Sequence, residues 1–329
     1  MTELRQANER SQSSASLKND FDRQPNKKNP TVRSVFLGER RIIEDREANF
    51  LSAEEAEVYR QGFKNWQALM ANSEDKIEKM ILTSARPVSC LVGLQPISSL
   101  EHGEGPFLND CLNKAGGEIK DGFCFLRNND GLILMVNLKA AELILRKHQV
   151  ALGLSLAETL SRDKIVLEIV NLISSPDQKR ADLAAGLLSG YPLKDCVDFI
   201  NKTNEEKVET TPWQRVRTLT NPDLELPQKS IADLNWERYT IDSNRNLDFR
   251  IYEFENGQIG IHGLGLLWFV ENLSSESIAQ IQKLWQVDRE LGLIDAVAKE
   301  RRSFSYEGNF WRIKLVRLIN TLLTKKKSS

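Results

Sequence analysis

The segment "GFCFLRNNDGLILMVNL" restricts the possible folds of this chain more than any other segment. Two apolar runs flank Asn129, Asp130 and Gly131, and Asp-Gly is a preferred turn of two-stranded hairpins. The run "LDFRIYEFENGQIGIHGLGLLWF" predicts a second hairpin around Asn256 and Gly257. The other patterned segments have helical periodicity and do not alternate with single strands. The sequence therefore predicts an α+β fold made of helices and two β-hairpins.

Local signals place the first helices. Ser52 followed by Glu55 matches a capping box, and apolar residues then recur at helical spacing. Residues 73–86 predict a second helix that ends before Pro87. Residues 87–100 are expected to form an apolar loop or a short strand.

The chain is expected to have two parts after a tail. Residues 1–34 are polar and almost without aliphatic side chains, so they are predicted to be disordered. Residues 35–203 are expected to form an α+β domain with one hairpin and a helical corner. Residues 204–229 are polar, contain three prolines and predict a linker. Residues 230–329 are expected to form a smaller α+β domain with the second hairpin and a basic terminal helix.

Charge and cysteine usage exclude several classes of protein. The formal net charge is −1 and the sequence pI is about 6.4, so no global charge attracts nucleic acid or an anionic membrane. The N-terminus lacks the apolar core of a secretory signal, and no apolar run reaches the roughly 20 residues of a membrane span. Four widely spaced cysteines predict buried free thiols in a reducing, cytoplasmic compartment. No spacing predicts a metal site, and no glycine pattern predicts a bound cofactor.

The stretch "LLSGYPLKDCVDFI" predicts a helical corner with the spacing of a helix-turn-helix. Gly186 would lie at the contact between the two helices, and Gly190 and Pro192 would lie in the turn. Three side chains are expected to anchor the second helix, namely Tyr191, Cys196 and Phe199.

The charges around this corner argue against DNA binding. The face of the second helix expected to be exposed carries Lys194, Asp195, Asp198, Asn201 and Lys202. Residues 162–206 hold six basic and eight acidic residues, a net charge of −2. Since phosphate contacts supply much of the affinity for DNA, a structural corner is the preferred interpretation.

Two motifs resemble an uncharacterised bacterial domain family. "SARPVSCLVGLQPISSL" contains the family's Gly-x-x-Pro step at Gly93 and Pro96, and the corner contains its Gly-Tyr-Pro-Leu-x-Asp pattern, from Gly190 to Asp195. The likeness covers about residues 80–203. The family's opening cysteine has no counterpart, because Arg86 precedes Pro87. The resemblance implies a fold and no activity.

A cysteine-dependent hydrolase or transferase is the enzymatic alternative. Cys90 as nucleophile and His102 as base would form the minimal catalytic pair, since a thiol needs a base within reach. Nothing in the spacing brings the two residues together, and buried structural thiols are the more common case.

Residues 309–327 predict a cationic amphipathic helix with a charge of +6 and no acidic residue. Such a helix can bind a protein groove, lie on an anionic membrane, or dock on its own domain. The residues assigned to such an interaction are Trp311, Arg312, Lys314, Arg317, Lys325, Lys326 and Lys327.

We therefore expect a non-enzymatic bacterial protein that acts by binding an unidentified protein partner. The featureless, serine-containing tail resembles the export signals of bacterial effectors, so export is part of this expectation. The cysteine-dependent enzyme is the first alternative, and a helix-turn-helix DNA-binding regulator is the second.

Overall fold

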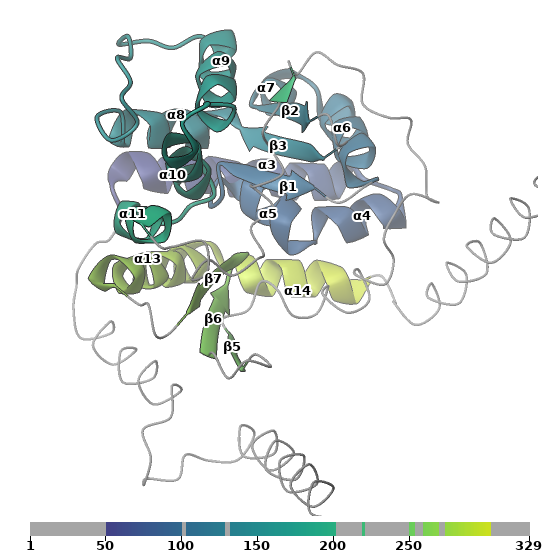
Figure 1. The fold of residues 1–329 in the computed structure, drawn as a ribbon. Helices are drawn as coiled ribbons and strands as arrows, with labels where there is room; N and C mark the ends of the chain where they lie inside the picture. Colours follow the sequence, from purple (N-terminus) through teal and green to yellow (C-terminus); the bar gives the residue numbers. More distant parts are fainter. Residues whose placement is uncertain are drawn as a thin grey trace, which may run out of the picture. The chain divides into compact units, whose positions relative to one another are not determined.

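The first predicted hairpin lies at the centre of an antiparallel sheet in the computed structural model (Figure 1). The structure describes residues 51–100, 103–128, 132–201, 219–220, 250–253, 259–269 and 274–303, which belong to one compact unit, Asn49–Ser329. The sheet has the order β1-β3-β2-β4. Its strands are β1 (Ile97–Leu100), β2 (Phe123–Asn128), β3 (Ile133–Asn137) and β4 (Leu219–Thr220).

The second predicted hairpin is also confirmed. β5 (Arg250–Glu253) pairs antiparallel with β6 (Ile259–Gly263), and β7 (Leu266–Phe269) adds a third strand. The turn residues of both hairpins, 129–131 and 256–257, lie outside the described residues. The predicted tail 1–34 and nearly all of the predicted linker 204–229 also lie outside them, so these domain boundaries stay predictions.

Helices surround the two sheets, and the α+β fold is confirmed. Among the described residues, seven helices lie before β1 or follow the strands of the first sheet: α3 (Ala53–Asn72), α4 (Lys76–Leu82), α5 (Ala85–Val92), α6 (Glu104–Ala115), α7 (Gly117–Asp121), α8 (Leu138–Lys147) and α9 (Arg162–Ile173). The corner consists of α10 (Gln178–Leu188) and α11 (Leu193–Asn201), and the later helices are α13 (Ser275–Leu291) and α14 (Leu293–Ser303). None of the described helices combines the length and apolar character needed to cross a membrane.

The start of α3 follows the predicted capping box. The Ser52 hydroxyl accepts from the Glu55 backbone N–H at 3.1 Å, and the Glu55 carboxylate accepts from the Ser52 N–H at 3.2 Å. The expectation of a loop or strand for the whole of residues 87–100 is wrong. Residues 85–92 form α5, with Pro87 in its first turn, where a helix does not need the missing N–H.

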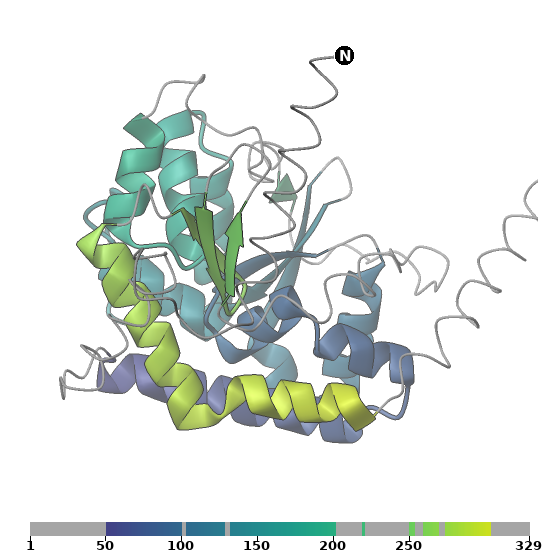
Figure 2. The same ribbon diagram turned by 90° about the horizontal axis from the view of Figure 1, so that it is seen from below.

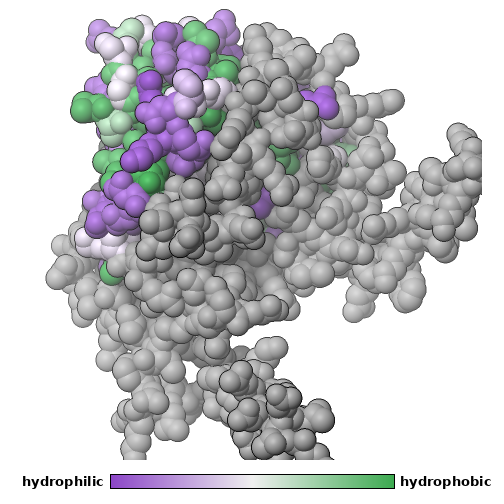
Figure 3. Space-filling view, in the orientation of Figure 1, coloured by the Kyte–Doolittle hydropathy of each residue, from purple (hydrophilic) through white to green (hydrophobic). Residues whose placement is uncertain are grey.

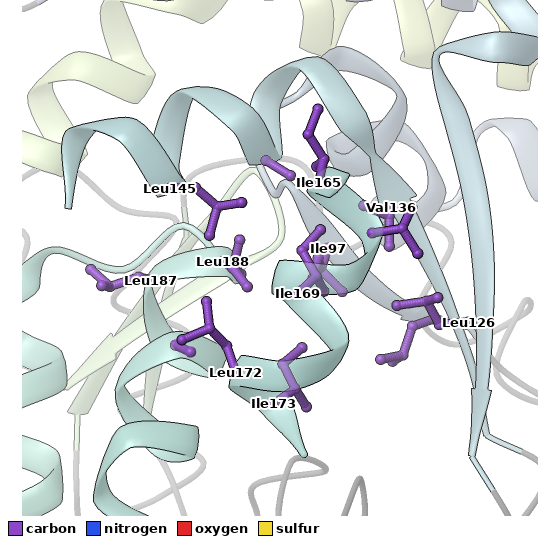
Figure 4. Close-up of a cluster of buried hydrophobic side chains, with 14 of the residues drawn as sticks. Ile97, Leu126, Val136, Leu145, Ile165, Ile169, Leu172, Ile173, Leu187 and Leu188 are labelled. Carbon is purple, nitrogen blue, oxygen red and sulfur yellow. The ribbon is translucent and has the colours of Figure 1, made fainter. Parts of the chain in front are cut away.

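One face of the first sheet packs against α8, α9 and α10 (Figure 4). Strand side chains such as Leu126 and Val136 meet Ile169 of α9 and Leu188 of α10, and all four are fully buried. Such close-packed aliphatic side chains supply most of the stabilisation of a domain of this kind.

The C-terminal segment packs on this helical part. α13 contacts α3 and α11, and α14 contacts α4 (Figure 2). The turn between β6 and β7 reaches α5, where the Ser89 hydroxyl donates to the backbone oxygen of Leu264 at 2.7 Å. Gln95 donates to the backbone oxygen of Gly265 at 2.8 Å. Polypeptide from both sides of the predicted linker therefore contributes to one interior.

A candidate functional cleft at the helical corner

A small cleft opens where the corner meets α3, α8 and α13. Its volume is about 160 Å³. Its lining includes Gly93, Leu94 and Pro96, apolar residues of α8 and the turn of the corner. Its charged lining residues come from three helices: Glu55 of α3, Lys147 of α8, and Glu276 and Lys283 of α13.

The two motifs that carry the family resemblance meet at this cleft. Gly93 and Pro96 line it from one side, and the corner turn of Gly190, Tyr191 and Pro192 lines it from the other. Gly190 has a φ of +92°, and a Cβ atom there would lie 2.8 Å from the backbone oxygen of Leu94. The close approach of the two backbones therefore requires glycine.

A buried carboxylate binds two lysines at the base of the cleft. The ammonium of Lys283 lies 2.6 Å from Glu55 Oε1, and the ammonium of Lys147 lies 3.1 Å from the same oxygen. The side chains of Glu55 and Lys283 are only 8% and 11% exposed, whereas that of Lys147 is 52% exposed. Lys283 Nζ also lies 5.7 Å from the centre of the Tyr59 ring, within cation–π distance.

The protonation equilibria of this cluster are shifted by burial and charge. Burial alone would raise the pKa of the Glu55 carboxyl, but the two ammonium groups outweigh it and hold that pKa at about 2. Burial and then the Glu55 charge raise the pKa of Tyr59. Partial burial and then the Lys147 charge lower the pKa of His148. Groups with shifted pKa values that converge in one cleft make it a candidate functional site.

The corner and α13 bind each other through the first turns of α11 and α13. Asp195 of α11 accepts hydrogen bonds from the hydroxyls of Ser274 and Ser277, at 2.8 and 2.7 Å, at the start of α13. In return, Glu276 of α13 accepts from the backbone N–H of Lys194 at 3.1 Å. A carboxylate near a helix N-terminus binds free N–H groups and is favoured by the helix dipole. Together, the cap that Glu276 makes on α11 and the serine hydroxyls that bind Asp195 fix α13 beside the cleft.

The predicted corner residues occupy the positions expected of a tight helix contact. A Cβ at Gly186 would lie 2.6 Å from Cys196 Sγ, so the two helices meet at this glycine. Cys196 is buried, and the Tyr191 ring lies edge-on to Trp268 with 6.4 Å between ring centres. Pro192 and Phe199 are partly exposed.

The cysteine side of the predicted catalytic pair lies away from solvent. Cys90 is 0% exposed, and its thiol donates to the backbone oxygen of Met135 at 3.4 Å. Burial raises the pKa of the Cys90 thiol, which favours the unreactive form. All four cysteines are free and buried, as expected from the sequence. His102 lies outside the described residues. Within the described part of the chain, no cluster of side chains could hold a metal ion.

Several residues that line the cleft were not predicted from the sequence. Glu55 was identified only as a capping residue, and Lys147 and Lys283 were not singled out. The helical periodicity of this segment could have indicated that Lys283 is buried. Lys283 lies four residues before Val287, on the face of α13 that also buries Leu284. The residues assigned to the terminal basic helix, Trp311 to Lys327, lie outside the described residues.

Comparisons with protein-family models, with curated proteins and with solved structures find no match to this chain.

Proposed function

We propose that this chain is a non-enzymatic protein that binds a protein partner through the corner cleft. The observation that carries the proposal is the composition of the cleft, in which apolar walls surround convergent charged groups. Sites for drug-sized ligands and cofactors occupy roughly 300–1,000 Å³. A cleft of about 160 Å³ is suited to one side chain or chain end of a partner.

The described surface seen in Figure 3 is mixed in polarity. In the view of Figure 3, apolar residues are interspersed with polar ones over the coloured helices. Among the described residues, the exposed large apolar side chains are Val150 and Leu167. Energy in protein interfaces is concentrated in a few anchor residues that enter pockets, so a small cleft is sufficient for recognition.

The two alternatives have less support from the described residues. The buried Cys90 thiol offers no accessible nucleophile for the enzymatic alternative. For the DNA-binding alternative, the first turn of α11 would have to approach bases and phosphates. That turn is instead engaged with α13 through Lys194 and Asp195.

A pair of leucine substitutions tests the proposal. Leu143 lines the cleft and is partly exposed, whereas Leu167 is 49% exposed on α9 and is not part of the cleft. We expect L143E to abolish capture of a stoichiometric partner by the full chain and L167E to leave it intact. Chains lacking residues 1–34 or 308–329 should still capture the partner.

Three results would overturn the cleft as the binding site: absence of any stoichiometric partner, capture that survives L143E, or capture lost only with a truncated terminus. Thermal unfolding of each variant shows whether its loss of capture merely reflects unfolding.

A further inference from the structure

The two lysines of the cleft hold more hydrogen-bonding capacity than Glu55 uses. An ammonium group has three N–H donors. In the described contacts, Lys147 and Lys283 each donate to one acceptor, and this acceptor is the same Oε1 atom. The two nitrogen atoms are therefore no farther apart than the sum of their distances to that oxygen, 3.1 and 2.6 Å. Two ammonium groups this close can both donate to one additional small anion.

The local charge favours a ligand with one negative charge. Two ammonium groups face a single buried carboxylate, Glu55, so these three groups together carry one positive charge, while Glu276 makes the lining of the whole cleft neutral. The other acidic residue of the lining, Glu276, is exposed and binds the backbone N–H of Lys194. A monoanion would neutralise the cluster, whereas a dianion would exceed its charge. Hydrogen bonds between ionised partners are about twice as strong as neutral ones.

The apolar lining of the cleft indicates that the negatively charged group of the ligand is joined to an apolar side chain. Leu143, Ile144 and Leu193 line the same cleft as the lysines and are partly exposed. In the last residue of a polypeptide, the carboxylate and the side chain leave the same Cα, so both fit in a small volume. An internal acidic residue would have to bring its own backbone and a separate apolar residue into about 160 Å³.

We propose that the cleft binds the C-terminal residue of a partner protein, with its carboxylate between Lys147 and Lys283 and its apolar side chain against Leu143 and Leu193. This inference rests on the proposed function and specifies the chemistry of the partner. Capture of a C-terminal carboxylate is one of the recurring modes of peptide recognition.

The test is a titration followed by methyl NMR of the full chain labelled at Ile, Leu and Val. The probe is N-acetyl-leucine, and its matched control is N-acetyl-leucinamide, which has the same side chain and no charge. We expect the acid to shift the methyl signals of Leu143, Ile144 and Leu193 in a saturable manner. The amide should bind at least about tenfold more weakly, as loss of a charged hydrogen-bonded contact requires.

Substitution of one lysine connects the selectivity to the cleft. K147M should remove the preference for the acid, while K139M should retain it, because Lys139 is exposed on the same helix and is not part of the cleft. Methyl spectra of both variants check that the fold is intact. Inorganic phosphate is the competitor, and displacement of the acid by phosphate at equal concentration would overturn the carboxylate assignment in favour of a phosphate site.

Equal binding of acid and amide, or no saturable shift, would overturn the inference. This failure is distinct from failure of the proposed function. A partner captured in an L143E-sensitive manner without acid selectivity would leave the protein-binding function standing. Selective binding of the acid without any captured partner would support a carboxylate site in the cleft and contradict the proposed protein-binding function.

Discussion

Replacement of Glu55 by glutamine is the most informative single substitution for stability. The amide keeps the shape of the carboxylate but removes its charge from two lysines, one of which is buried. The variant therefore leaves the Lys283 ammonium in a buried site without a charged partner. Removal of one member of a buried ion pair typically destabilises a protein by about 3–5 kcal/mol.

The pKa of Glu55 gives a second, independent value for the free energy that its charge contributes to folding. Its folded value of about 2 lies below the ordinary 4.5, and this difference corresponds to about 3 kcal/mol of stability at neutral pH. Lys147 is half-exposed, so solvent screens its share of that energy. We expect E55Q to lose about 2–3 kcal/mol of unfolding free energy at pH 7.

The pH dependence has a defined sign. The depressed pKa means that Glu55 stabilises the fold fully above pH 4.5 and loses this contribution as the pH falls toward 2. The difference between wild type and E55Q should therefore be constant above about pH 6 and fall by roughly half at pH 3. Titration of the other carboxylates is common to both proteins and cancels in the difference.

Urea unfolding followed by far-UV circular dichroism measures this difference at each pH. E54Q is the control, because Glu54 is an exposed residue in the same first turn and changes the same helix-dipole interaction. The double variant E55Q/K283M should recover part of the loss, because it removes the unpaired buried ammonium. A loss below about 1 kcal/mol for E55Q, or a difference that stays constant down to pH 3, would refute the reasoning.

Two further substitutions test the geometry of the corner, and a chemical modification tests the burial of Cys90. G190A should lose about 2–4 kcal/mol in urea unfolding, whereas G292A, at a left-handed helical position with no atom near its Cβ, should lose only about 1 kcal/mol; equal losses would contradict the close backbone contact. D195N should lower the unfolding free energy by about 1–2 kcal/mol and D198N, on the exposed face, by less than about 0.5, so equal effects in thermal unfolding would contradict a stabilising contact between Asp195 and the start of α13. Cys90 should react with a thiol reagent only at the rate of unfolding, as mass spectrometry of alkylated peptides can show; rapid labelling of the native chain would contradict its burial.

Features with a local cause were predictable from the sequence. The capping box of Ser52 and Glu55 depends on residues three positions apart, and the hairpin pairing follows from apolar runs on both sides of a turn. The helix α5 was not predicted because proline was taken to end a helix. In the structure Pro87 lies in the first turn, where its missing N–H is harmless.

The cleft was not predictable because its parts are distant in the sequence. Glu55 is separated by 92 residues from Lys147 and by 228 residues from Lys283. No periodicity or spacing rule acts across such separations, since only the packing of α3, α8 and α13 brings these side chains together. The corner itself was recognisable, but its use as a support for α13 depends on Ser274 and Ser277, which follow it by about 80 residues.

The most direct test of the central claim is the amount of partner captured by wild type, L143E and L167E in one isotope-labelled experiment. We predict that wild type and L167E capture a stoichiometric partner and that folded L143E does not. Equal recovery with all three chains would show that the partner binds elsewhere, and would contradict the cleft as the functional site.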